Sequence, residues 1–140
     1  IQETDIRIFA GGSTKNYKGK MPGILEELLI SIKKKTPIYL LGGFGGIVSD
    51  ICKCIENEDV PEVLTMEWQI INNNNYKELM ELYKKKGEEI DYLKIVKEIK
   101  NIKMNNGLNI EDNRKLYNTV YIDEAIYLVL KGLKNIWRRK

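Results

Sequence analysis

Residues 37–46 read PIYLLGGFGG, an apolar stretch that ends in a run of glycines. The apolar part, residues 37–41, predicts a buried strand, because it is short, contains β-branched and aromatic residues and stops at a turn signal. A helical pattern of apolar residues follows over 47–55. The same order occurs upstream, where residues 5–10 (DIRIFA) end at Gly11-Gly12 and a helical pattern begins at Pro22. Strand, glycines and helix therefore occur twice, which predicts parallel strands joined by a crossover helix.

The remainder of the chain predicts helices. Apolar residues recur with helical spacing over 22–35, 47–55, 61–71, 76–86, 92–104, 109–118 and 123–136, and Asn109 is placed to cap the helix that follows it. We expect one domain over residues 1–140, with an α/β fold, a Rossmann-like parallel sheet, crossover helices and a helical C-terminal half. Independent sheets usually need about three strands. We therefore expect either a second copy in a homo-oligomer or a segment upstream of Ile1 to supply further strands.

Composition excludes several kinds of site. The 140 residues include no histidine, which removes the Ser-His-Asp and Cys-His arrangements and ordinary zinc sites. The net charge of +3, from 23 basic and 20 acidic residues, is too small to indicate a nucleic-acid groove. No apolar run reaches the roughly 18 residues of a membrane span. We expect a cytoplasmic protein with no metal and no cofactor, whose two cysteines, Cys52 and Cys54, are buried thiols in a reducing compartment.

Both glycine runs are predicted to lie beyond the carboxyl ends of the strands, where open α/β sheets bind their ligands. Glycine lets the backbone approach a ligand closely, and the amide groups at a helix start favour phosphate. On this interpretation, a phosphate or ribose phosphate is cradled by Gly11, Gly12, Gly42, Gly43, Gly45 and Gly46. The alternative is that the glycines only form tight turns between strand and helix. Phe44, an aromatic residue inside the second run, could stack on a base or shape the cleft.

Two glutamates, Glu26 and Glu27, occupy the first turns of the helix that begins after Pro22. Acidic residues at a helix start are also explained by the helix dipole. Because the chain has no histidine, however, a glutamate near the glycines is the group most available to act on a sugar. It would bond ribose hydroxyls in a binding protein, or stabilise an oxocarbenium-like centre in an enzyme.

Residues 10–27 resemble the SLOG superfamily, a Rossmann-like group that includes the LOG phosphoribohydrolases and the DNA-processing protein A fold. LOG enzymes carry Pro-Gly-Gly-x-Gly-Thr-x-x-Glu after a strand. This chain has Ala10-Gly11-Gly12, an insertion over 13–22, and then Gly23-Ile24-Leu25-Glu26-Glu27, so Glu27 falls on the glutamate of the pattern. Ala10 stands at the position of the proline and Ile24 at that of the threonine. These departures and the long basic insertion favour binding over hydrolysis.

A closer resemblance is to the SLOG subgroup associated with bacterial conflict-system and TIR proteins. Its pattern, Gly-x-Met-Pro-Gly-x-x-Glu-Glu followed by Gly-Gly-Phe-Gly-Gly, is matched at residues 19–27 and 42–46. The resemblance implies a sensor of a nucleotide or an ADP-ribose-type ligand in antiphage defence or signalling, with a TIR or other effector as partner. The alternative is an N-glycosidase, nucleotide hydrolase or deoxyribosyltransferase-like enzyme with Glu27 as its catalytic residue. The expected ligand-binding residues are Gly11, Gly12, Lys20, Met21, Pro22, Gly23, Glu26, Glu27, Gly42, Gly43, Phe44, Gly45 and Gly46.

Overall fold

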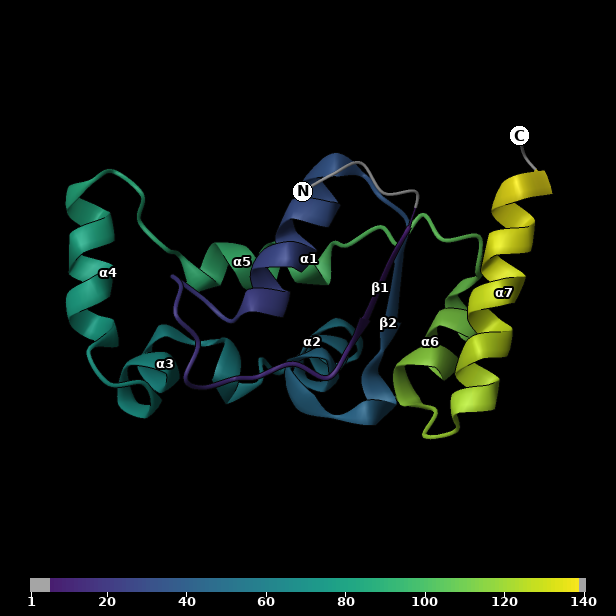
Figure 1. The fold of residues 1–140 in the computed structure, drawn as a ribbon, viewed down its shortest axis with the longest axis horizontal. Helices are drawn as coiled ribbons and strands as arrows, with labels where there is room; N and C mark the ends of the chain where they lie inside the picture. The colour runs from purple at the N-terminus through teal and green to yellow at the C-terminus, as the bar shows by residue number, and fades with distance from the viewer. Residues whose placement is uncertain (1–5, 139–140) are drawn as a thin grey trace.

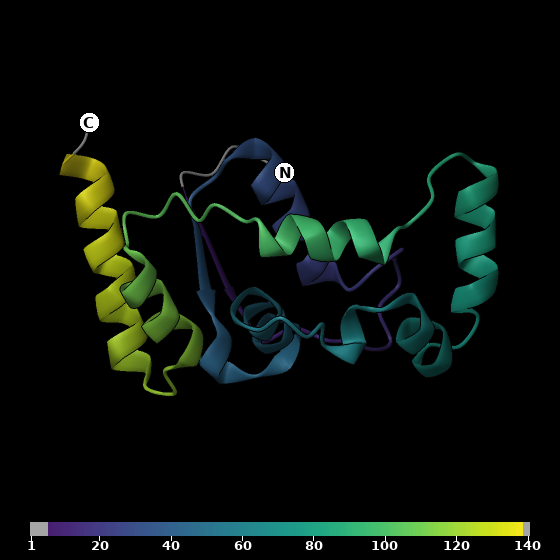
Figure 2. The ribbon, with the colours of Figure 1, turned by 180° about the vertical axis from the view of Figure 1, so that it is seen from behind.

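The computed structural model describes residues 6–138 and shows two strands between two groups of helices (Figures 1 and 2). The architecture is mixed α/β, as the sequence predicted. In chain order the elements are β1 (Arg7–Ala10), α1 (Gly23–Lys34), β2 (Ile38–Leu41), the 3-10 helix η1 (Gly42–Phe44), α2 (Gly46–Glu56), the 3-10 helix η2 (Glu62–Leu64), α3 (Met66–Asn72), α4 (Tyr76–Lys85), α5 (Tyr92–Lys100), α6 (Ile110–Asn118) and α7 (Ile122–Arg138).

The two strands pair in parallel, with Arg7 opposite Ile38 and Ala10 opposite Leu41. Because α1 connects them, the predicted pair of parallel strands with a crossover helix is confirmed. Within residues 6–138 the sheet contains these two strands and no third. The predicted first strand began at Asp5, which lies outside the described residues.

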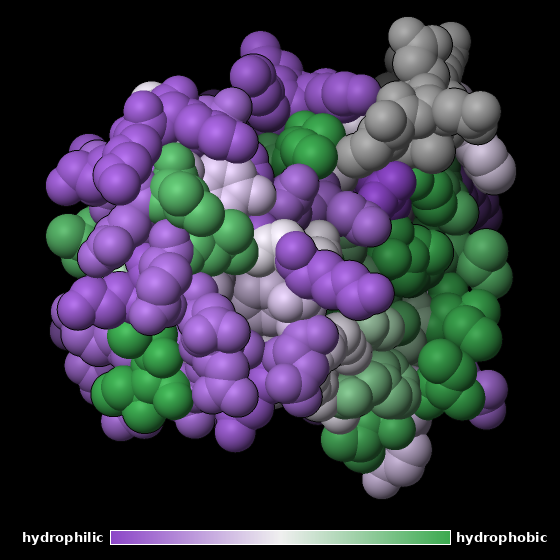
Figure 3. Space-filling model, turned by 60° about the vertical axis from the view of Figure 1, so that its left-hand side comes forward, coloured by the Kyte–Doolittle hydropathy of each residue, from purple (hydrophilic) through white to green (hydrophobic). Residues whose placement is uncertain are grey.

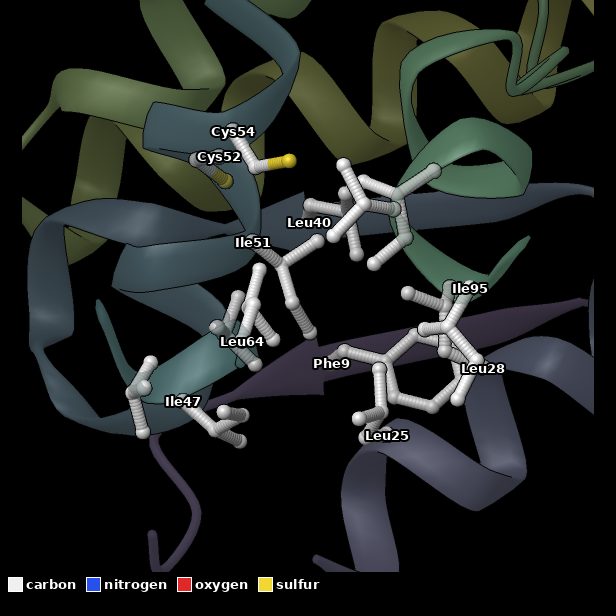
Figure 4. Packing of buried hydrophobic residues seen from close by; sticks show 14 of the residues in the cluster. Phe9, Leu25, Leu28, Leu40, Ile47, Ile51, Cys52, Cys54, Leu64 and Ile95 are labelled. Atoms are coloured by element: carbon white, nitrogen blue, oxygen red, sulfur yellow. The ribbon is translucent and has the colours of Figure 1, made fainter. Parts of the chain in front are cut away.

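Every side chain of β2 is buried, because helices cover both faces of the sheet. Successive side chains of a strand point to opposite faces. Ile38 and Leu40 therefore join the larger apolar cluster, in which Phe9 of β1 meets α1, α2 and α5 (Figure 4). Tyr39 and Leu41 point to the other face and pack against α6 and α7. One short strand thus carries the core on both sides.

The segment after α5 departs from the prediction. A helix was expected over 92–104, but α5 ends at Lys100 and the chain continues without regular structure. Met104 O accepts a hydrogen bond from the N–H of Ile38 (2.9 Å), and the Nδ2 of Asn106 donates to Ile38 O (2.7 Å). These bonds satisfy the backbone N–H and carbonyl of Ile38 on the edge of β2 that faces away from β1. If the helix continued, both groups would lack these partners. Pairing with β2 therefore overrides the helical pattern of residues 101–104.

The predicted helix over 61–71 is also wrong in part. It is divided into η2 and α3 at Thr65, whose backbone is extended (φ −124°, ψ 149°). The Thr65 side chain accepts a hydrogen bond from the N–H of Trp68 (3.2 Å) and so caps α3. The prediction of an Asn109 cap is confirmed, because its Oδ1 accepts from the N–H of Asp112 (2.8 Å).

Cys52 and Cys54 are buried free thiols, as the sequence predicted. Burial raises the pKa of the Cys52 thiol to about 12, with a smaller contribution from the Glu56 carboxylate. Burial also raises the pKa of Cys54, and Lys100 partly opposes that shift. Within the described part of the chain, every helix is too short or too polar to cross a lipid bilayer.

Candidate functional site

The two glycine runs touch each other at the carboxyl edge of the sheet. A Cβ on Gly46 would lie 2.4 Å from the carbonyl carbon of Gly11, so the backbones are in direct contact. The N–H of Ile47 donates to Gly12 O (3.0 Å), and the N–H of Val48 donates to Gly11 O (3.1 Å). These are amides of the first turn of α2, which a phosphate cradle would use. In this chain they are satisfied by the first glycine run instead.

Several of the predicted site glycines are required for close packing. A Cβ on Gly42 would lie 2.4 Å from Tyr117 O, and one on Gly43 would lie 1.8 Å from Thr119 O. Gly12 fits between the side chains of Ile24 and Ile47, which would be 2.6 and 2.7 Å from its Cβ. These glycines let the end of α6 and the start of α1 approach the strand ends. The tight-turn interpretation accounts for them.

Three glycines remain open at the same edge. A Cβ on Gly11, Gly23 or Gly45 would meet no other atom within 4 Å, and Gly11 and Gly45 have positive φ values of 66° and 81°. Gly23 is the first residue of α1, and Pro22 before it provides no side-chain cap. The N-cap residue therefore gives the first amides of α1 no side-chain partner, while the helix dipole favours an anion beside them. Backbone with open space beside it, from the β1–α1 and the β2–α2 connections, therefore lies at the carboxyl edge of the sheet.

A hollow of about 240 Å³ opens beside the second glycine run. Side chains from α2 and α6 line it together with the glycines. Asn118 Nδ2 donates to Glu56 Oε1 (2.9 Å) across the α2–α6 contact. The lining residues are Gly42, Gly43, Gly45, Ser49, Cys52, Lys53, Glu56, Tyr117 and Asn118. Sequence reasoning missed the contribution of α6, because nothing in a single sequence shows that the end of α6 reaches the strand ends. Phe44, on the same loop, has 39% of its surface exposed.

The two glutamates point to different places. Glu27 Oε2 accepts from Arg7 Nη2 at 2.6 Å, so this carboxylate is paired with the start of β1, away from the carboxyl edge. Glu26 lines a second hollow, of about 460 Å³, together with Lys20 and Met21 on one side of α1 and Glu98 of α5. The structure therefore does not bring Glu26 and Glu27 together with the second glycine run.

Helices α3, α4 and α5 hold the polar insertion between Gly12 and α1. The Tyr17 hydroxyl donates to Gln69 Oε1, and the N–H of Asn16 donates to Asn73 Oδ1 (3.1 Å). The Tyr76 hydroxyl donates to Lys20 O and lies 3.0 Å from the Tyr92 hydroxyl. The insertion is thus a fixed wall beside the start of α1. Its anchors lie more than fifty residues away in the chain, so the sequence pattern did not reveal them.

Comparison with known protein families gives a match. A family model described as SLOG cluster2 matches residues 1–116, which include both glycine runs and most of α6. The chain belongs to the SLOG cluster2 family. Helix α7 lies beyond the matched residues. Neither a curated protein nor a solved structure matches the chain.

The sequence also allows a second placement of the LOG pattern on this chain. Its Gly-Gly-x-Gly part also fits Gly42-Gly43-Phe44-Gly45, which follow β2 without an insertion. In this placement the glutamate of the pattern falls on Ser49, which lines the hollow beside those glycines. A serine there can hydrogen bond a sugar or phosphate but supplies no carboxylate. Among the described residues, no three acidic or cysteine side chains gather as a metal site requires.

Proposed function

We propose that this SLOG cluster2 protein binds a nucleotide or an ADP-ribose-type ligand at the carboxyl edge of a Rossmann-like domain and acts as a sensor in a defence or signalling system. The observation that carries the proposal is the open backbone at Gly11, Gly23 and Gly45, beside the uncapped start of α1. A ligand phosphate would lie against the first amides of α1. Its base or ribose would extend toward Phe44 and the hollow that Ser49 lines.

Charge on the anchored insertion supports an anionic ligand. Lys15, Lys18 and Lys20 lie on the segment that leads into α1. The Lys15 ammonium group lies 5.6 Å from the centre of the Trp68 ring, and this cation–π contact holds it against α3. Basic residues on the segment that leads into a helix raise the local concentration of anions. Nucleotide phosphates are therefore the ligand group that this region suits best.

Binding is better supported than hydrolysis of an N-glycosidic bond. A catalytic carboxylate must reach the sugar carbon that reacts. Glu27 accepts a hydrogen bond from Arg7 instead, and Ser49 occupies the glutamate position in the second placement of the LOG pattern. An enzyme would need Glu27 to leave Arg7 and turn toward the carboxyl edge.

Native mass spectrometry and isothermal titration calorimetry of the purified chain test the proposal, with AMP, ADP, ATP, NAD and ADP-ribose as probes. We compare Gly23→Glu with Gly23→Gln, which differ in charge at a position where a side chain meets open space. Glutamate suits a helix start, so both variants should fold. We expect the wild type to retain one of the probes, and Gly23→Glu to bind it at least about tenfold more weakly than Gly23→Gln, because about 1.4 kcal/mol of added repulsion is enough.

Retention of none of the probes would contradict the proposal, as would equal binding by the two Gly23 variants. Free base in the supernatant, abolished by Glu27→Gln, would instead establish the enzymatic alternative. Release of base that survives Glu27→Gln would place the catalytic group elsewhere.

A further inference from the structure

In the part of the chain that the structure describes, no strand pairs with the outer edge of β1. Within residues 6–138, β2 is the one strand bonded to β1. The N–H of Arg7 donates to Pro37 O, so the backbone groups of Arg7 point toward β2. Because these groups alternate between the two edges along a strand, those of Ile8 and Ala10 point outward. Such an edge is a template for pairing with another strand.

Helix α7, which covers the face of the sheet to which Tyr39 and Leu41 point, carries an exposed apolar stripe. It buries Ala125, Leu128, Val129 and Gly132 against the sheet. A second set, spaced so that its members stack along one side of the helix, is left largely exposed. This set comprises Ile122 (54% exposed), Ile126 (51%), Leu130 (59%) and Trp137 (66%). Monomeric proteins rarely leave such a stripe uncovered.

The stripe lies on the β1 side of α7, because Asn135, on the opposite side of the helix, donates to Gly107 O (2.9 Å), next to the Asn106 that bonds the β2 edge facing away from β1. Leu133, which shares that side of the helix, and Ile6, which precedes β1, both pack against the cluster beneath α7. Ile8 points to the same face of the sheet as Tyr39, its partner in β2, yet it is 51% exposed. Figure 3 shows hydrophobic side chains gathered along its right-hand side, the side that faces the viewer in Figure 1. We call Ile8, Ile122, Ile126, Leu130 and Trp137 the β1–α7 face.

We propose that the β1–α7 face binds a second copy of the chain across a twofold axis perpendicular to the sheet. The two β1 strands would pair antiparallel, with Ile8 of each copy opposite Ala10 of the other. This pairing uses the outward backbone groups of both residues and joins the two sheets into one. A twofold interface places the same patch of both copies in contact, so apolar surface meets apolar surface.

Charges beside the stripe match a second copy. Asp123 and Lys134 are eleven residues apart, about three helical turns, so they lie on the same side of α7 near opposite ends of the stripe. When two copies of α7 run antiparallel, Asp123 of each meets Lys134 of the other and Ile126 meets Leu130. The stripe itself carries no charge. This end-to-end complementarity favours a second copy over an unrelated apolar partner.

Sedimentation velocity of the purified chain over a range of concentrations tests the dimer. We expect a species of twice the monomer mass that dissociates on dilution. Ile8→Lys and Leu130→Lys each place a charge in the β1–α7 face and should give monomer. Leu93→Lys is the matched control, because Leu93 lies on α5, outside this face, and is 85% exposed. Circular dichroism checks that each variant is folded.

A charge exchange tests the orientation of the two helices. Asp123→Lys and Lys134→Asp should each weaken the dimer several-fold, because each places like charges opposite each other. The double variant restores opposite charges at both ends and should return to the wild-type dissociation constant. A chain that stays monomeric at every concentration would overturn the proposal. A dimer that tolerates both Ile8→Lys and Leu130→Lys would overturn it as well, as would a double variant no tighter than the single ones.

Discussion

At the scale of single residues, the glycines fall into two groups, according to whether a Cβ on them would meet other atoms or open space. Gly42 and Gly43 have backbone atoms of α6 or its C-terminal cap residue where a Cβ would be, whereas Gly23 and Gly45 have open space. The first pair allows elements to pack closely, and the second leaves backbone free for a ligand. The sequence shows the glycines but not their neighbours, so it predicted one role for all of them.

Gly43→Ala should destabilise the fold, and Gly23→Ala should not. An alanine Cβ at position 43 would lie 1.8 Å from Thr119 O, and backbone must move to accommodate it. We expect a loss of about 1–3 kcal/mol in the free energy of unfolding. At position 23 the new Cβ meets open space in a helix, and a gain of up to about 1 kcal/mol is expected. Urea unfolding measures both, and equal stabilities would contradict the packing role of Gly43.

The raised pKa of Cys52 makes stability fall at high pH. The unfolded thiol has the ordinary pKa of 9.0, whereas burial raises the folded value to about 12. Between these values the unfolded chain has released a proton that the folded chain keeps, so rising pH favours unfolding. We expect Cys52 to contribute a slope of about 1.4 kcal/mol per pH unit there. Urea unfolding of wild type and Cys52→Ala at pH 9 to 11, under reducing conditions, should show the shallower slope in the variant.

At the scale of elements, the insertion before α1 depends on helices that follow much later. Tyr76 at the start of α4 is 3% exposed, and its hydroxyl contacts both Lys20 O and the Tyr92 hydroxyl. Burial is the main cause of a raised pKa for Tyr76, so its hydroxyl keeps its proton to a higher pH than an exposed tyrosine does. Helix α4 therefore positions a wall of the candidate site without lining the glycines itself.

Tyr76→Phe should loosen the insertion. It leaves Lys20 O and the Tyr92 hydroxyl without this partner, which costs about 1–3 kcal/mol. We expect faster trypsin cleavage after Lys15, Lys18 or Lys20 in the variant, because a loosened segment is cut more readily. Tyr121→Phe is the control, since Tyr121 lies in the connection between α6 and α7 and is 70% exposed. Unchanged cleavage in Tyr76→Phe would mean that the other contacts hold the insertion alone.

The sequence predicted an element correctly where that element depends on residues close to it in the chain. Both strands, the parallel pairing and the Asn109 cap follow from short patterns, and the structure confirms them. The end of α5 and the break at Thr65 were missed, because they depend on bonds to Ile38 and on a cap within an apolar run. At the candidate site, the glycines were visible in the sequence, whereas Ser49 and Asn118 required knowledge of how α2 and α6 meet.

At the scale of the whole molecule, β2 links two cores. Ile38 and Leu40 belong to the cluster with α1, α2 and α5, whereas Tyr39 and Leu41 belong to the cluster with α6 and α7. Asn106 reinforces the link, because its amide bonds both Ile38 O and Asn113 Oδ1 at 2.7 Å. Loss of either cluster exposes half of β2. The two halves should therefore unfold together.

Leu128→Ala tests this coupling from α7. Leu128 is 2% exposed, so its truncation should cost about 2–5 kcal/mol. Trp68 of α3 packs against the other cluster and becomes the sole tryptophan in a Trp137→Phe background. If the halves are coupled, Leu128→Ala lowers the urea midpoint of Trp68 fluorescence as much as that of far-ultraviolet circular dichroism. A Trp68 midpoint that stays fixed while part of the circular dichroism signal is lost earlier would show that the α6–α7 side unfolds independently. Because β2 is buried on both faces, we expect the midpoints to move together.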